Sequence, residues 1–221
     1  MTADSLRTFS VKQRFLLLAG TASCLVLPVL LLALAAGWVC PDGACRVTDL
    51  DRQVLAAFHA LRGPGLDVFF EGVTWLGSVL VLVPLGLGMA WRIRHRPGDA
   101  ARFFLSLVGA GLLAFATKPL VARPRPDLFP FAPLPEDLSF PSGHAMLVTA
   151  FALGWLLFAK ERRGWADVAA GVALIAAVAA SRLYLQVHFP TDVAAGVLAA
   201  TAWVLSLQWL PRAAVKPDGS K

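Results

Sequence analysis

Charged side chains are scarce in this chain of 221 residues. Asp, Glu, Lys and Arg make up 15% of it, hydrophobic residues 57%, and the mean hydropathy is +0.67. Soluble domains carry roughly 25% charged residues. The shortage of charge argues against an ordinary soluble domain and predicts an integral membrane protein. The alternative is a soluble bundle that buries its apolar helices.

Cysteine is also scarce, with three in the chain, and none has a metal-binding spacing with histidine. Cys40 and Cys45 flank the turn-forming sequence Pro-Asp-Gly-Ala. The sequence is compatible with a local disulfide between these two cysteines and equally with two free thiols. Cys24 lies within an apolar run, where we expect a small apolar filler.

Six uncharged runs dominate the sequence. A helix that crosses a bilayer needs roughly 20 apolar residues, and three of the runs are shorter. We interpret the short runs as helices that continue into a polar cavity lined by protein. The predicted fold is therefore all-α, a polytopic membrane bundle with six transmembrane helices. The runs are Phe15–Cys40, Gly72–Trp91, Phe103–Thr117, Ala145–Ala159, Val168–Ser181 and Val193–Pro211.

A more polar segment, residues 41–71, separates the first two runs and leads into the second span. Asp49 is a candidate helix cap, and apolar residues from Leu50 to Leu61 recur at helical spacing. The pattern fits either an interfacial helix on the membrane or a core-facing helix of an extracytoplasmic cap. We expect a structural element here and not a site.

The distribution of lysine and arginine predicts the orientation. Alternate loops and the two ends hold 13 of the 20 basic residues, and such loops face the cytoplasm. We therefore expect cytoplasmic tails at residues 1–14 and 212–221, and a six-span domain over residues 15–211 in the inner (plasma) membrane. The net charge of +6 reports this topology, so we predict no nucleic-acid partner. The first run is too long for a typical secretion signal and is read as a span.

Three short stretches place cations, imidazoles and a carboxylate at the ends of the apolar runs. Charge at membrane depth is costly and marks function. By loop counting all three stretches share the extracytoplasmic face. They are Lys118 with Arg125-Pro126, Pro141-Ser142-Gly143-His144, and Ser181-Arg182 with His188 and Asp192.

The first stretch favours a phosphate site built from cations. A phosphate ester carries negative charge that enzymes neutralise with metal ions or with Lys and Arg. The nearby acids Asp127, Glu136 and Asp137 lack a metal-ligand pattern, so we expect no cofactor; Mg²⁺ or Zn²⁺ is the alternative. Arg123 is expected to be a surface charge or an auxiliary phosphate contact.

The other two stretches supply groups for catalysis. Ser142 and Gly143 precede an apolar helix, where backbone N–H groups and the helix dipole favour an anion, although Ser142 is also a natural cap. His144 is a candidate general acid. If a helix starts near Pro190, Asp192 turns back to orient His188 for attack; the alternative is a plain helix cap and a loop histidine.

Together the three stretches resemble the signature of the type 2 phosphatidic acid phosphatase superfamily, which includes lipid phosphatases and haloperoxidases. The resemblance implies that His188 attacks phosphorus, Asp192 orients it and His144 protonates the leaving group. It implies a bell-shaped pH profile. Phosphoryl oxygens would be held by Lys118, Arg125, Arg182, Ser142 and Gly143.

The resemblance implies metal-independent hydrolysis of a lipid phosphate or diphosphate in the outer leaflet. Undecaprenyl diphosphate, phosphatidylglycerol phosphate and phosphatidic acid are the leading substrates, and a lipid A phosphate is an alternative. A phosphotransferase would use the same intermediate, and a lipid-binding protein would need only the basic pocket. The membrane spans disfavour a haloperoxidase. The sequence leaves the oligomeric state open.

Overall fold

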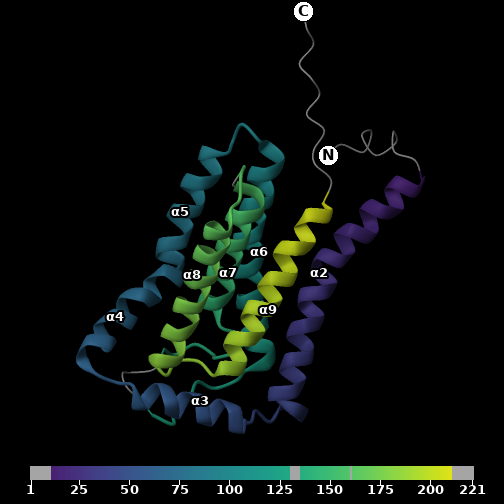
Figure 1. The fold of residues 1–221 in the computed structure, drawn as a ribbon. Helices are drawn as coiled ribbons and strands as arrows, with labels where there is room; N and C mark the ends of the chain where they lie inside the picture. The colour runs from purple at the N-terminus through teal and green to yellow at the C-terminus, as the bar shows by residue number, and fades with distance from the viewer. Residues whose placement is uncertain (1–10, 130–134, 160, 211–221) are drawn as a thin grey trace, which may run out of the picture.

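Helices make up all the regular secondary structure in the part of the chain that the structure, a computed structural model, describes: residues 11–129, 135–159 and 161–210. Long helices stand side by side, and α3 crosses beneath one end of them (Figure 1). The helices are α2 Val11–Val39, α3 Asp49–Ala60, α4 Pro64–Thr74, α5 Val79–Arg92, α6 Pro97–Val121, α7 Gly143–Gly154, α8 Trp165–Tyr184 and α9 Pro190–Ser206, with short turns η1 Pro41–Gly43, η2 Trp75–Gly77, η3 Trp155–Ala159 and η4 Leu207–Trp209.

The predicted apolar runs are mostly helical where the structure describes them, but not all of these helices are long enough to span. Three of those described are long and apolar enough to cross a membrane, namely α6, α8 and α9 with η4. The pair α4 and α5, bent by 46°, adds a fourth if it counts as one span. Leu25–Val39 and Gly143–Ala159 are apolar but shorter. The chain is thus a multi-pass helical membrane protein, and the count of six spans stays a prediction.

Apolar side chains cover much of the outside of the bundle. On α6, Leu112, Phe115 and Leu120 are 63%, 77% and 83% exposed. Leaving such side chains in water costs each of them about 1.5–3 kcal/mol of burial free energy. Such a surface is favourable when it contacts the hydrocarbon core of a bilayer instead of water.

The short helix α7 lies inside the bundle, packed against α6, α8 and α9. Ala145, Met146, Val148 and Ala150 are fully buried along it. A helix surrounded by protein does not need the full apolar length of a lipid-facing span, because its neighbours provide the apolar environment. This position places the start of α7 at the centre of the bundle.

The predicted cap segment forms α3, with one correction at its start. Thr48 and not Asp49 is the N-cap, and its side chain accepts a hydrogen bond from the Asp51 amide. Asp51 closes the reciprocal bond to the Thr48 N–H, which makes a capping box. A disulfide joins Cys40 to Cys45 just before this helix.

The two predicted tails are only partly described. Residues 11–14 of the amino-terminal tail belong to α2, whereas residues 1–10 and 211–221 lie outside the described residues.

Candidate active site

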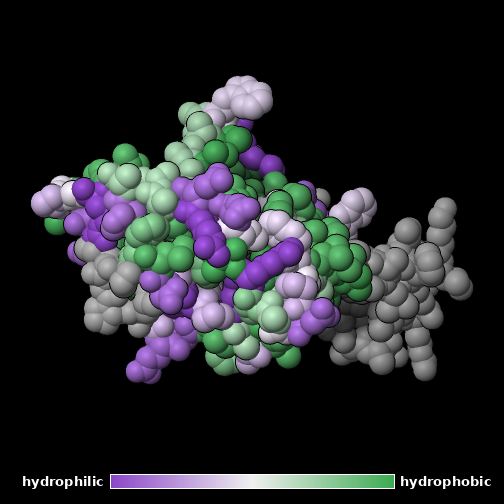
Figure 2. Space-filling model, turned by 90° about the horizontal axis from the view of Figure 1, so that it is seen from below, coloured by the Kyte–Doolittle hydropathy of each residue, from purple (hydrophilic) through white to green (hydrophobic). Residues whose placement is uncertain are grey.

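The three sequence stretches meet at one end of the bundle. Lys118 lies near the end of α6 and Arg182 near the end of α8, whereas His144 and Asp192 lie in the first turns of α7 and α9. The ends of two helices and the starts of two others therefore converge. Figure 2, which views the molecule from this end, shows hydrophilic residues gathered among hydrophobic ones.

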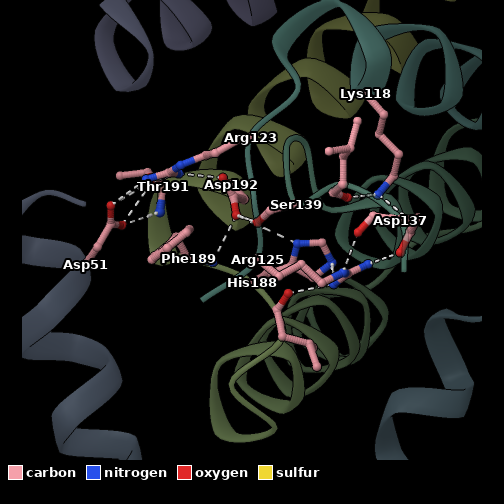
Figure 3. Close-up of polar contacts among 12 residues, drawn as sticks. Asp51, Lys118, Arg123, Arg125, Asp137, Ser139, His188, Phe189, Thr191 and Asp192 are labelled. Atoms are coloured by element: carbon pink, nitrogen blue, oxygen red, sulfur yellow. Dashed lines mark hydrogen bonds and ion pairs between the residues drawn. The ribbon is translucent and has the colours of Figure 1, made fainter. Parts of the chain in front are cut away.

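The first stretch is shaped by a backbone turn. Ala122 ends α6 in the left-handed conformation, with φ of 52°, and its N–H donates to the Lys118 carbonyl. A residue with a side chain adopts this conformation at a cost of roughly 1–2 kcal/mol. The turn sends the chain back across the end of the bundle, so Arg123 and Arg125 lie over α9 and the loop before it (Figure 3).

Asp137 bridges the two cations of this stretch. Its carboxylate accepts a hydrogen bond of 2.7 Å from Lys118 Nζ and another from Arg125 Nη2. Partial burial would raise the pKa of this carboxyl, but the bonds from Lys118 and Arg125 lower it to about 2. Asp137 is therefore an anion held between two cations, and its side chain is 54% exposed.

Arg125 also contacts the predicted nucleophile. Its Nη1 donates 2.6 Å to the Val187 carbonyl and lies 3.2 Å from His188 Nε2. Burial, supported by the positive charges of Arg182 and Arg125 and opposed by Asp192, lowers the pKa of His188 to about 4. The imidazole is therefore neutral near pH 7, the form that has a free ring nitrogen for attack.

Asp192 lies behind the imidazole. Helix α9 begins at Pro190, as predicted, and the carboxylate turns back so that its Oδ2 lies 3.8 Å from His188 Nδ1. This separation exceeds hydrogen-bond range, although the carboxylate lies next to the imidazole. The same carboxylate accepts hydrogen bonds from the Phe189 N–H at 2.9 Å and from the Ser139 hydroxyl. Asp192 is thus both a helix cap and a partner for His188.

Arg123 is not the surface charge that the sequence suggested. It is 1% exposed, and its Nη1 donates 2.6 Å to Asp192 Oδ1. It also binds a residue that lies 72 positions earlier in the sequence, because its Nη2 donates a hydrogen bond of 2.9 Å to Asp51 Oδ2. A buried guanidinium requires such partners, since an unpaired buried charge costs several kcal/mol. Arg123 is therefore a buried residue of the site that binds Asp192 and links it to Asp51.

The second stretch is bound directly to the third. The Ser142 N–H donates 3.2 Å to the Asp192 carbonyl. At Gly196 a side chain would meet the Ser142 carbonyl at 2.9 Å, so only glycine lets α9 approach the start of α7 this closely. Gly143 faces open space. His144 lies within electrostatic range of Arg182, His188, Arg125 and Lys118.

Three buried polar atoms of these stretches have no hydrogen-bond partner among the described residues. They are Ser142 Oγ, Arg182 Nε and His188 Nδ1. Arg182 is otherwise anchored through Nη1 to the Thr74 hydroxyl at the end of α4. Buried polar atoms are nearly always satisfied, and each unmet one costs about 1–3 kcal/mol. His188 Nδ1 faces Asp192, whereas Ser142 Oγ and Arg182 Nε are left as donors for a polar ligand.

Residues 99–215 match the PAP2 superfamily, a stretch that covers more than half of the chain and all three motifs. The chain belongs to the PAP2 superfamily. It is a membrane-embedded phosphatase of that superfamily.

Its relatives include several lipid phosphatases. Phosphatidylglycerophosphatase B of Bacillus subtilis (strain 168) is 33% identical over 163 residues, which cover 68% of this chain and 77% of the relative. Lipid A 1-phosphatase of Rhizobium johnstonii is 37% identical over 47% of this chain and 43% of its own length. Undecaprenyl-diphosphatase of Sulfolobus acidocaldarius is 36% identical over 47% of this chain and 52% of its own length.

The same fold is found in a solved structure. The crystal structure of the PAP2-type phosphatidylglycerolphosphate phosphatase from Bacillus subtilis superposes with a TM-score of 0.70 at 24% identity, over 82% of this chain and 94% of that one. This likeness shows that the helical arrangement of the PAP2 chain is that of a known membrane phosphatase fold.

Sequence reasoning missed four residues at this PAP2 site. Asp137 was considered only as a metal ligand, Arg123 was placed on the surface, and Ser139 and Asp51 were not singled out. Each is distant in sequence from the group that it contacts, and this holds for Arg123 too, although it lies inside the first motif. The local signal in the sequence was Pro124, because the backbone of the residue before a proline is restricted to extended conformations.

Proposed function

We propose that this PAP2 enzyme hydrolyses a lipid phosphate or diphosphate through a phosphohistidine intermediate, without a metal ion. The observation that carries the proposal is the gathering of Arg125 and Arg182 around the buried His188, with Lys118 joined to Arg125 through Asp137, beside polar atoms that lack partners among the described residues. Cations placed in this way neutralise phosphoryl oxygens and leave the imidazole free to attack.

In the first step His188 Nε2 attacks phosphorus. The Nε2–P bond forms while the bond from phosphorus to the leaving oxygen breaks, and His144 gives that oxygen a proton. Nε2 is the attacking atom because it faces Arg125, whereas Nδ1 faces Asp192. Asp192 balances the positive charge that the ring gains.

In the second step water attacks the phosphohistidine. His144, now neutral, takes a proton from the water, the N–P bond breaks and phosphate is released. Ser142 Oγ and Arg182 Nε are the donors that we assign to the phosphoryl oxygens, because each is buried and unpartnered. The Gly143 backbone completes the set at the start of α7.

An apolar groove supports a lipid as the leaving group. A cavity of 430 Å³ lies between α5, α6 and α7, lined by apolar side chains and glycine from Val79 to Leu147. Its lining residues Val79 and Leu147 follow Gly77 and His144 by two and three positions, and a side chain at Gly77 would meet the His144 ring at 3.2 Å. A tail in this groove would place the lipid oxygen beside the proposed acid.

The relatives act on different lipids, so the substrate is proposed as a class. Phosphatidylglycerol phosphate, undecaprenyl diphosphate and phosphatidic acid are the leading substrates, with a lipid A phosphate as the alternative. The relatives named for the first two and for lipid A support this range. A terminal phosphoryl group is common to all of them, and the part of the lipid that carries it differs.

We further infer six spans, with the site on the extracytoplasmic side. The basic turn after α5 is held at the opposite end of the bundle, where Arg96 Nη2 donates to the Ala159 carbonyl. The disulfide Cys40–Cys45 precedes α3, the helix that crosses the site end, and disulfides persist in oxidising compartments. Both observations agree with the positive-inside rule.

A cysteine-labelling experiment tests this orientation. In intact cells, a membrane-impermeant maleimide is expected to label Glu136→Cys, an exposed residue beside the site, and to label Arg94→Cys only after permeabilisation. The reverse pattern would place the site on the cytoplasmic face.

The function itself is tested by phosphate release from purified protein. The panel contains phosphatidic acid, phosphatidylglycerol phosphate, undecaprenyl diphosphate and lipid A in detergent, each with and without chelator. We expect free phosphate from at least one, at a rate that chelator leaves within about twofold. Transfer of labelled phosphate to a second lipid, with little release, would favour the phosphotransferase. A loss of activity in chelator that added metal restores would contradict the cation-only site.

Asp137 is expected to compete with the substrate phosphate. It occupies Lys118 and Arg125, so the phosphate has to displace its carboxylate before both cations are available. Asp137→Asn should lower the inhibition constant of inorganic phosphate by about two- to fivefold, because an ion pair with an exposed partner is worth under about 1 kcal/mol. Competitive inhibition assays measure this. Glu136→Gln is the matched control, and equal constants for both variants would contradict the prediction.

A further inference from the structure

Helix α3 lies outside the part of the chain that matches the PAP2 superfamily, yet it contacts the centre of the site. The match begins at residue 99, whereas α3 spans Asp49–Ala60. Two side-chain contacts join α3 to the segment around His188. Asp51 accepts hydrogen bonds from Thr191, and the Leu55 carbonyl accepts one of 3.1 Å from Gln186.

Asp51 is more deeply bound than a helix cap requires. Its side chain is fully buried, and it accepts bonds from the Thr191 N–H at 3.1 Å and hydroxyl at 2.9 Å. Arg123 Nη2 donates to it at 2.9 Å. The capping box accounts only for the bond from Thr48. The remaining partners all surround Asp192.

Arg123 joins the two carboxylates. One of its nitrogens donates to Asp192 Oδ1 and the other to Asp51 Oδ2 (Figure 3). Its guanidinium also stacks 4.1 Å from the centre of the Phe189 ring, next to His188. The group thus forms a fixed row in the order Asp51, Arg123, Asp192, His188.

The charges in this row do not cancel. Two buried carboxylates share one guanidinium, so the three side chains carry a net charge of −1. Without Asp51, Arg123 would neutralise Asp192 alone, and the group behind the imidazole would have no net charge. Attack on phosphorus makes the ring positive, and a negative neighbour in a buried site stabilises that charge strongly.

We propose that Asp51 is a positioning residue for the phosphoryl transfer: by sharing Arg123 it leaves the group behind His188 with a net negative charge, and it holds Arg123 where Arg123 keeps Asp192 beside His188. The inference rests on the proposed function. It makes α3 part of the catalytic apparatus, contrary to the expectation that residues 41–71 are only structural.

The test compares Asp51→Asn with Thr48→Ala, using dioctanoyl phosphatidic acid as substrate. Thr48→Ala removes the N-cap bond of the same helix but leaves the charge of Asp51, so it reproduces a merely structural loss. Asp51→Asn is expected to lower kcat/KM by roughly 10- to 100-fold, the scale on which residues that orient a functional side chain act. Thr48→Ala should stay within about threefold of the wild type.

Inorganic phosphate separates transfer from binding. Its inhibition constant should change by less than about twofold in Asp51→Asn, because the proposed phosphate donors are untouched. A loss of kcat/KM with a parallel loss of phosphate binding would overturn the inference, as would equal activity of Asp51→Asn and Thr48→Ala.

The double variant Asp51→Asn with Arg123→Gln tests the charge balance. It removes one positive and one negative charge and leaves the negative charge of Asp192. The double variant should therefore recover at least a third of the loss in log kcat/KM that Asp51→Asn causes. A double variant no better than Asp51→Asn would contradict the proposal.

The double variant also covers a failure to fold, because removing one member of a buried ion pair is strongly destabilising whereas replacing both is often tolerated. If Asp51→Asn does not fold, activity of the double variant within about tenfold of wild type supports the inference, and a complete loss overturns it. Wild-type protein inactive on every lipid phosphate would instead overturn the proposed function, and the inference with it. Active wild type with an unaffected Asp51→Asn would overturn the inference alone.

Discussion

Replacement of His188 by alanine is expected to lower turnover of a lipid phosphate by at least about 10³-fold, because the proposed covalent step loses its nucleophile. The imidazole is 2% exposed and its Nδ1 has no hydrogen-bond partner among the described residues, so the variant loses packing contacts and the Arg125 contact at Nε2, and its folding has to be checked. Phosphate release and thermal unfolding are measured on the same preparation. A folded variant that retains a tenth of the activity would reject His188 as the nucleophile.

Two further measurements separate this role from a structural one. Rapid quenching with labelled substrate should trap an acid-labile phosphoryl group on the wild type and none on His188→Ala. The acid limb of wild-type kcat/KM should lie near pH 4, because the rate rises as the buried His188 loses its proton. The same midpoint for a monophosphate and a diphosphate assigns the limb to the enzyme. His59→Ala, an exposed histidine of α3, is the matched control and should keep full activity.

Replacement of His144 by alanine is expected to have the second largest effect, and its size should depend on the leaving group. For a lipid monophosphate the departing alkoxide needs a proton, so kcat should fall by about 10²- to 10⁴-fold. For p-nitrophenyl phosphate the departing phenolate is stable without one, and the loss should be smaller by at least about tenfold.

The pair of substrates provides the control for His144. A misplaced α7 would slow both substrates equally, since the start of this helix also carries Ser142 and Gly143. Equal losses would therefore contradict the assignment of His144 as the acid, even if both rates were low. His188→Ala measured in parallel should lose both substrates alike.

The site joins a deep, rigid half to a more open one. Behind His188, Asp192 and Arg123 are buried and fixed by bonds from α3, α9 and the loop at Ser139. In front, Asp137 is half exposed and holds Lys118 and Arg125 where the phosphate is proposed to bind. Rigid positioning of the nucleophile and an exchangeable anion at the cations suit an enzyme that binds and releases phosphate in each cycle.

The sequence by itself determined the class of protein and the main groups of the site. Composition and the six apolar runs identified a helical membrane protein, because hydropathy is a local property that a membrane span requires of every turn. The three motifs identified the PAP2 superfamily, because their residues are close together in sequence. The start of α9 at Pro190 was predictable for the same reason, since proline favours the first turn of a helix.

Only the tertiary structure decided which groups surround those motifs. Arg123 binds Asp51, which lies 72 residues away, and Asp137 reaches Lys118 across 19 residues. Neither contact leaves a trace in local spacing, because a buried ion pair is fixed by how helices pack and not by the order of residues along the chain. The sequence thus determined the chemistry that the chain contains, and the packing of α3 against α9 decided which charges act on it.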